Sequence, residues 1–73
     1  MEIRNNTITN RELETLRLIS KGLDNQEIAQ QLCVSIHTVK AHIEKLYRKF
    51  GTHSKVAAVV FAMKAGLISL DEI

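Results

Sequence analysis

Three side chains of the types that bind zinc lie close together in the middle of the sequence. Cys33, His37 and His42 form a C-x3-H-x4-H pattern, and thiolate and imidazole groups are common zinc ligands. A closed zinc site needs four converging ligands, but the chain contains a single cysteine. On a helix of about 100° per residue, the two histidines also point roughly 140° apart. We therefore expect no metal and no other cofactor.

Catalysis is disfavoured by the size of the chain as well as by its motifs. A domain of 73 residues buries only about 60% of its unfolded surface, which leaves little room for a deep cavity. The Ser, His and acidic residues of the sequence form no pattern that indicates an activated nucleophile. No glycine-rich phosphate loop is present either. We expect a protein that is not an enzyme.

Basic residues are concentrated in one part of the chain. Residues 33–64 hold six Lys or Arg and one acidic residue, whereas residues 1–32 hold four basic and five acidic residues. Such a concentration suits a polyanionic partner. On charge alone, a solvated helix face with no partner is the better interpretation, so the helical positions of these residues become decisive.

Caps and glycines divide the chain into helices. Thr9 and Glu12 have capping-box spacing, and Gly22 can adopt the left-handed conformation that ends a helix. No segment alternates as a strand does. The sequence predicts a single all-α domain over residues 1–73, with helices at about 10–20, 25–32, 36–50 and 54–65. The expected starts of the later helices are Asp24 or Asn25, Ser35, and Ser54.

The second and third predicted helices, joined by the short segment "CVS", form a helix-turn-helix motif at residues 25–44. The third helix is amphipathic and has one apolar stripe that we expect to face the core. The stripe contains Val39, Ile43, Leu46 and Phe50. Its expected partners on the first two helices are Leu16, Ile19, Ile28 and Leu32.

The opposite stripe of the third helix is polar and must face water or a ligand, because burying it would leave charges unpaired. It contains His37, Lys40, Ala41, Glu44 and Arg48. An α-helix fits the major groove of DNA. There Lys40 can donate to guanine, Ala41 can contact a thymine methyl group, and Glu44 can accept from cytosine N4 or exclude other bases. The predicted helix at 36–50 is therefore a candidate for DNA recognition.

The fourth predicted helix is apolar on two sides. Val56, Val59, Val60 and Met63 fill one side, which we assign to the core. The other side contains Ala58, Phe61, Ala62 and Ala65. A second apolar stripe predicts a partner, and we expect a two-fold symmetric homodimer through this side. The alternative is that the alanines serve only as good helix formers.

The ordered motifs resemble the LuxR-type (NarL/FixJ/GerE-like) helix-turn-helix domain of bacterial transcription regulators over nearly the whole chain. "TNRE" is similar to the TxRE opening, "GLDNQEIA" to GxxNxEIA, "SIHTVKAHI" to SxxTVKxH, and "AGLI" to the closing motif. The resemblance implies double-stranded DNA as partner, a third helix in the major groove and dimerisation through the fourth. The chain departs from the family pattern at four positions. Lys45 stands where the family usually has Asn, and Lys55 stands where it often has Arg. Thr15 replaces a usual aliphatic residue, and Phe50 replaces a usual leucine.

Together, the helix starts, the basic residues and the family positions predict a set of phosphate contacts. These are Asn25, Ser35, His37, Thr38, Lys45, Arg48, Lys49, Ser54 and Lys55. The expected base contacts are Lys40, Ala41 and Glu44. The acidic residues Glu12, Asp24 and Glu27 are expected to act as helix caps.

The favoured function is therefore sequence-specific DNA binding by a bacterial transcription regulator, such as the output domain of a response regulator. RNA polymerase is left open as a further partner. A sigma-factor region 4 and a helical protein-interaction module are the alternatives, and the fourth helix with "AGLI" argues against the first. The start of the sequence lacks a signal-peptide pattern, and the longest apolar run, residues 56–63, is too short to span a membrane. We expect a cytoplasmic protein.

Overall fold

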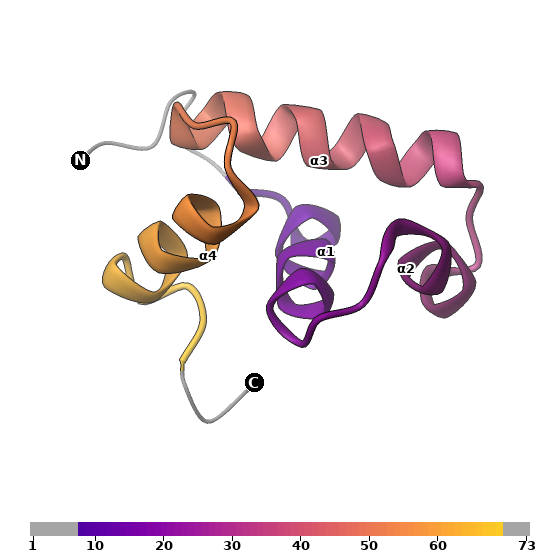
Figure 1. Cartoon of the computed structure of the whole chain (residues 1–73), viewed down its shortest axis with the longest axis horizontal. Helices are drawn as coiled ribbons and strands as arrows, with labels where there is room; N and C mark the ends of the chain where they lie inside the picture. The colour runs from indigo at the N-terminus through magenta and orange to yellow at the C-terminus, as the bar shows by residue number, and fades with distance from the viewer. Residues whose placement is uncertain (1–7, 70–73) are drawn as a thin grey trace.

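The computed structural model describes residues 8–69, which contain four α-helices and no strand. Helix α1 spans Asn10–Ser20, α2 spans Asn25–Leu32, α3 spans Ile36–Phe50 and α4 spans Lys55–Lys64. Figure 1 shows α3 lying across the top of the molecule, with α2 beneath its beginning, α1 beneath its middle and α4 beneath its end. The predicted all-α fold is confirmed.

Local hydrogen bonds explain where the first two helices begin. The Thr9 hydroxyl accepts from the Glu12 amide at 3.1 Å, and the Glu12 carboxylate accepts from the Thr9 amide at 3.0 Å. Asp24 and Glu27 form the same reciprocal arrangement at 2.8 and 2.9 Å. Each capping box satisfies two amides that the helix itself leaves without acceptors.

The turn of the helix-turn-helix is made by residues 33–35. Cys33 ends α2 in the left-handed conformation, with a φ of 57°. This conformation is unfavourable for a side chain with a Cβ, and the Cys33 thiol is exposed at the surface. Ser35 then begins α3, because its hydroxyl accepts from the Thr38 amide at 3.1 Å.

Helix α4 is slightly shorter than the predicted segment 54–65, because the residues at its two ends are caps. The Ser54 hydroxyl accepts from the Ala57 amide at 3.2 Å, and Ala65 is the C-cap. Gly51 ends α3 in the left-handed conformation with a φ of 70°. The bounds of the other three helices agree with the prediction.

Two apolar clusters hold α3 from below, one at each half of the helix. Val39, in its first half, is fully buried with Ile28 of α2 and with Ile19 of α1. Leu46 and Phe50, in its second half, are buried with residues of α1 and α4. The predicted core stripe of α3 is confirmed, with Ile43 as its half-buried member, and its expected partner Leu32 at the end of α2 is also half-buried.

The predicted assignment of the two sides of α4 is wrong for most of its residues, although Val59 and Met63 are half-buried against the core as expected. Ala58, Phe61 and Ala62, which we expected at a dimer interface, are 0%, 4% and 0% exposed within the domain's own core. Val56 and Val60, which we expected inside, are 72% and 43% exposed. Nearly every position of α4 is apolar, so apolar periodicity cannot distinguish its inner side from its outer side. Ala65, also expected at the interface, is an exposed cap.

The unusual residues Thr15 and Phe50 are accommodated by specific contacts. Thr15 is fully buried in α1, and its hydroxyl donates to the Arg11 carbonyl at 2.9 Å, so the polar group is satisfied within the helix. The Phe50 ring lies against the Phe61 ring. Both substitutions therefore fit the core.

None of the helices within residues 8–69 has the length and apolar character that crossing a membrane requires.

Candidate nucleic-acid interface

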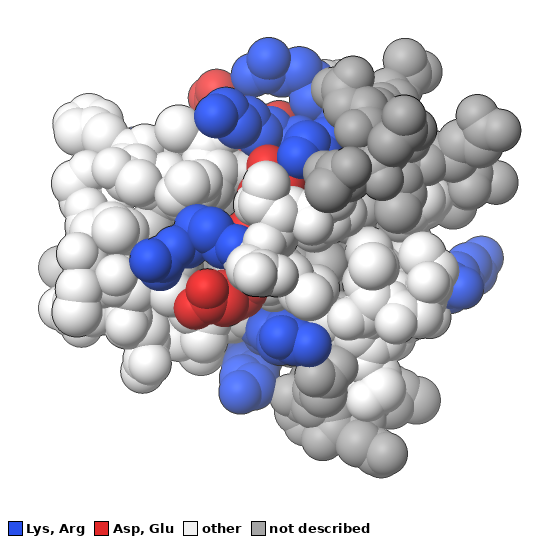
Figure 2. Space-filling model, turned by 180° about the vertical axis from the view of Figure 1, so that it is seen from behind, with Lys and Arg blue, Asp and Glu red and all other residues white. Residues whose placement is uncertain are grey.

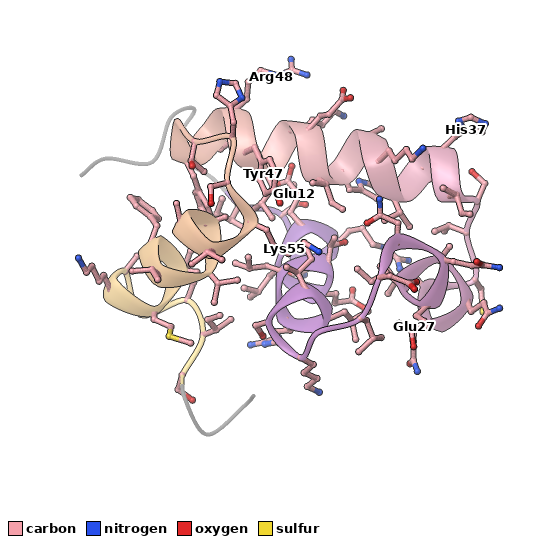
Figure 3. The ribbon with its side chains drawn as sticks, viewed as in Figure 1. Glu12, Glu27, His37, Tyr47, Arg48 and Lys55 are labelled. Carbon is pink, nitrogen blue, oxygen red and sulfur yellow. The ribbon has the colours of Figure 1, made fainter. Side chains whose placement is uncertain are left out.

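The upper side of α3 is an exposed surface, because the buried stripe of the helix, formed by Val39, Leu46 and Phe50, turns toward the other helices. We call this surface the reading face. Figure 3 shows His37 near its beginning and Arg48 near its end, both projecting away from α1. Its exposed members are His37, Lys40, Ala41, Glu44, Lys45 and Arg48. The structure thus brings the three predicted base-contact residues onto one surface.

The beginning of α3 presents backbone amides and hydroxyl groups at the edge of the reading face. The hydroxyls of Ser35 and Thr38 lie 3.0 Å apart. Because Ser35 also accepts from the Thr38 amide, the cap holds both side chains in place. Amides at a helix N-terminus favour anions. This end of α3 has groups that suit an anion, and a phosphate contact of Ser35 and Thr38 stays a prediction.

A groove continues the reading face past the end of α3. It is lined by Glu44, Tyr47, Arg48, Gly51, Thr52 and His53. Burial raises the pKa of the Tyr47 phenol, so the group stays a neutral hydrogen-bond donor around neutral pH. Arg48 adds a fixed positive charge, and the groove therefore presents several hydrogen-bond donors beside the reading face.

Lys49 does not project from α3 as a free cation, in contrast to its predicted role at phosphate. Its Nζ atom lies 2.6 Å from Oε1 of Glu12 in the first turn of α1. The two side chains are only 14% and 3% exposed. Glu12 therefore does more than cap α1, as we expected of it, because it also holds the ammonium group of a residue 37 positions away.

The environment of Glu12 keeps this carboxylate ionised. Burial raises its pKa, but hydrogen bonds from Lys49 and from the Thr9 amide, with the positive charge of Lys49, outweigh burial. The pKa of Glu12 is therefore lower than its ordinary value of 4.5. A charge-assisted hydrogen bond of this kind is shorter and stronger than a neutral one.

The remaining predicted phosphate contacts lie at the beginnings of α2 and α4. Asn25 is the half-buried first residue of α2. Ser54 is exposed and caps α4. Lys55 is exposed, but Figure 3 shows it extending toward α1, apart from His37 and Arg48. The structure therefore does not bring Lys55 onto the reading face.

Charge on the surface is uneven. Figure 2 shows the face opposite to that of Figure 1, where several Lys and Arg side chains gather along the upper edge, at the level of α3. Other basic side chains are scattered below them, and acidic ones are few.

Within residues 8–69, no group of three or more His, Cys, Asp or Glu side chains is arranged to hold a metal ion.

Sequence reasoning missed two exposed apolar features. Ile36, in the first turn of α3, is 39% exposed and lies four residues before Lys40, so helical spacing places it at the edge of the reading face. The outer valines of α4, Val56 and Val60, were assigned to the core. The helical spacing between Ile36 and Lys40 could have predicted that Ile36 is exposed. The sequence of α4 contains no comparable signal for the exposure of Val56 and Val60.

Comparisons with known proteins agree with this architecture. Residues 6–62 match the family model described as bacterial regulatory proteins, luxR family. The nitrate/nitrite response regulator protein homolog of Haemophilus influenzae is 52% identical over 54 residues, which cover 74% of this chain and 26% of that protein. The oxygen regulatory protein NreC of Staphylococcus aureus is 46% identical over 61 residues, which cover 84% of this chain and 28% of NreC.

A solved structure is also similar. It is that of the VqmA dimer of Vibrio cholerae, a LuxR-type receptor, in the absence of target DNA. The two chains share 38% identity with a TM-score of 0.78, over 84% of this chain and 28% of that one. The chain thus spans between a quarter and a third of the length of these proteins. With its family model, its relatives and its four helices in agreement, the chain belongs to the luxR family of bacterial regulatory proteins.

Proposed function

We propose that this helix-turn-helix domain of a transcription regulator binds double-stranded DNA sequence-specifically, with α3 in the major groove. The observation that carries the proposal is the division of α3 into a buried stripe and an exposed reading face. Lys40, Ala41 and Glu44 lie in the middle of that face, where a helix in the major groove meets base edges. The family to which the chain belongs supports the same conclusion.

Phosphate contacts would flank the base contacts at both ends of α3. The capped first turn offers amides and the hydroxyls of Ser35 and Thr38, with His37 beside them. At the other end, Lys45 and Arg48 are exposed and carry charges that suit the DNA backbone. Phosphate contacts on both sides fix the register of a helix in the groove.

We also propose that the domain dimerises on DNA through the outer side of α4, which Val56 and Val60 form. The exposed apolar surface of two valines is far smaller than the roughly 1,000 Å² that a stable interface buries. Dimerisation would therefore need a palindromic site that holds two domains about 34 Å apart. The similar VqmA of Vibrio cholerae is a dimer, which supports this proposal.

Selection of bound duplexes from a random pool tests the proposed function, because it reports both the preferred sequence and the spacing of half-sites. On the selected site, the logarithm of affinity should fall with the logarithm of salt concentration at a slope of about −0.9 per phosphate contacted. A flat response with no enriched sequence would contradict DNA binding and favour the protein-interaction module.

The dimer is tested separately with light scattering in the presence and absence of the selected duplex. Two domains should bind the full site with positive cooperativity, and Val56→Asp should abolish the cooperativity while a half-site duplex is bound as before. Glu14→Asp, at an exposed position of α1, is the control substitution. Unchanged cooperativity in Val56→Asp would exclude this side of α4 as the interface.

A further inference from the structure

The ion pair between Glu12 and Lys49 connects the two parts of the domain that must be aligned for DNA recognition. Glu12 lies in the first turn of α1, and Lys49 lies in the last turn of α3. The carboxylate is itself fixed, because Oε1 also accepts from the Thr9 amide in the capping box. The ammonium of Lys49 is therefore held by a group that cannot easily move.

Apolar packing restricts how α3 is rotated about its own axis less sharply than a directional contact does. The two clusters beneath α3 attract its buried stripe, but the hydrophobic effect has no preferred direction. A charge-assisted hydrogen bond does have one. The contact between Nζ of Lys49 and Oε1 of Glu12, at 2.6 Å, thus restricts the rotation of α3 about its axis. Packing of Leu46 and Phe50 restricts the same rotation less strictly.

Rotation of α3 matters at the reading face because its side chains extend far from the helix axis. At a radius of roughly 6 Å, a rotation of about 20° moves a side chain by about 2 Å. Hydrogen bonds to base edges tolerate only a few tenths of an ångström around their usual length. A small loss of rotational restraint would therefore affect base contacts more than contacts to the flexible DNA backbone.

From these contacts we infer that the Glu12–Lys49 pair is a positioning device for sequence recognition, which sets the rotation of α3 from inside the domain. The inference rests on the proposed DNA binding and changes the role of Lys49 within it. Lys49 acts on recognition through the placement of α3, and not through a contact with phosphate. Glu12 has the corresponding role on α1.

Salt dependence distinguishes a positioning residue from a phosphate ligand. We would measure the affinities of the full chain for the selected duplex and for a scrambled duplex by fluorescence anisotropy at several salt concentrations. Lys45→Met is the matched control, because it removes one exposed charge from the same helix. It should make the salt slope about 0.9 less negative and leave the ratio of the two affinities nearly unchanged.

Lys49→Met and Glu12→Gln should behave differently from that control. Each substitution should leave the salt slope as in the wild type. Each should also lower the preference for the selected duplex over the scrambled duplex about five- to tenfold, because the two residues act as a coupled unit. Lys49→Arg keeps a charged donor for Glu12 and should restore most of the preference. A slope change in Lys49→Met equal to that of Lys45→Met would overturn the inference, as would an unchanged preference.

Two additions keep the test decisive if a single variant fails to fold. The double variant Glu12→Gln/Lys49→Met leaves no unpaired buried charge, and such replacements are commonly tolerated; it should show the same loss of preference. Without DNA, amide exchange in the double variant should accelerate at residues 47–50 more than at residues 39–42, whereas equal acceleration would overturn the inference. If the wild type binds no duplex, the proposed function fails and the role of the pair in recognition fails with it, whereas the exchange measurement still tests whether the pair restrains the end of α3.

Discussion

The ring of Phe50 at the end of α3 lies 4.7 Å from the ring of Phe61 in α4, with an angle of 34° between their planes. Both residues are 4% exposed. Tilted aromatic pairs at this distance contribute beyond the area they bury. The pair joins α3 to α4 and makes the inner side of α4 part of the domain's own core.

The first prediction concerns this inner side. Phe61→Leu should lower the free energy of unfolding by about 1 kcal/mol, because it removes the ring contact and leaves a small void. Val56→Ala on the exposed side should change it by less than about 0.5 kcal/mol. Urea denaturation of the two variants checks both values, and equal stability would contradict the assignment of the two sides.

The second prediction concerns pH. Because the pKa of Glu12 is lower in the folded chain than its ordinary value, its ionised form stabilises the fold at neutral pH. This contribution is complete above about pH 5 and is lost as the pH falls below about 4.5 and through the folded pKa. The stability difference between the wild type and Glu12→Gln should therefore shrink on acidification from pH 6 to pH 3.

Comparing the two proteins at each pH removes the effects of the other titrating groups, which they share. Thermal unfolding followed by circular dichroism is sufficient for the measurement. A difference that stays constant down to pH 3 would show that the Glu12 carboxylate gains nothing from Lys49 and the capping box.

The third prediction concerns the turn of the helix-turn-helix. Cys33→Gly should stabilise the domain by about 0.5 kcal/mol, because glycine adopts the left-handed conformation without the cost of about 1–2 kcal/mol that a Cβ carries. The greater freedom of glycine in the unfolded chain offsets part of the gain. Cys33→Ala keeps the Cβ and is the control, with an expected change close to zero. A destabilised glycine variant would refute this account of the turn.

The fourth prediction concerns the reading face. Lys40→Ala should cost about 1–3 kcal/mol on the selected duplex and relax the preference at one base position. Arg48→Ala should weaken all duplexes alike and make the salt slope less negative by about 0.9. Anisotropy titrations on a panel of single-base variants separate the two patterns. Identical behaviour of the two substitutions would contradict the base contact of Lys40.

Helix bounds were predictable because the interactions that define them are local. The capping box of Thr9 and Glu12 and the cap at Ser35 involve residues three positions apart, and their side-chain types suffice to recognise them. The buried stripe of α3 was predictable for a similar reason, because its polar side contrasts with its apolar side.

On α4 the assignment was wrong, and at Lys49 the partner was missed, because position in the fold, and not residue type, decides the outcome. Phe61 and Val60 are both apolar neighbours in α4, so only packing against α1 and α3 determines which is buried. Lys49 has the charge and helical setting of a phosphate contact. Its contact with Glu12 spans 37 positions and leaves no local pattern in the sequence.

The separation of the two stripes on α3 has a consequence for how the domain can evolve. Lys40, Ala41 and Glu44 are exposed, and surface substitutions away from caps and core contacts usually change stability by less than about 0.5 kcal/mol. New combinations at these three positions are therefore free to arise without endangering the scaffold beneath them. Under the proposed base contacts, one stable framework could in this way be retargeted to many operators, and exchange of these three residues is the first step in testing such a change.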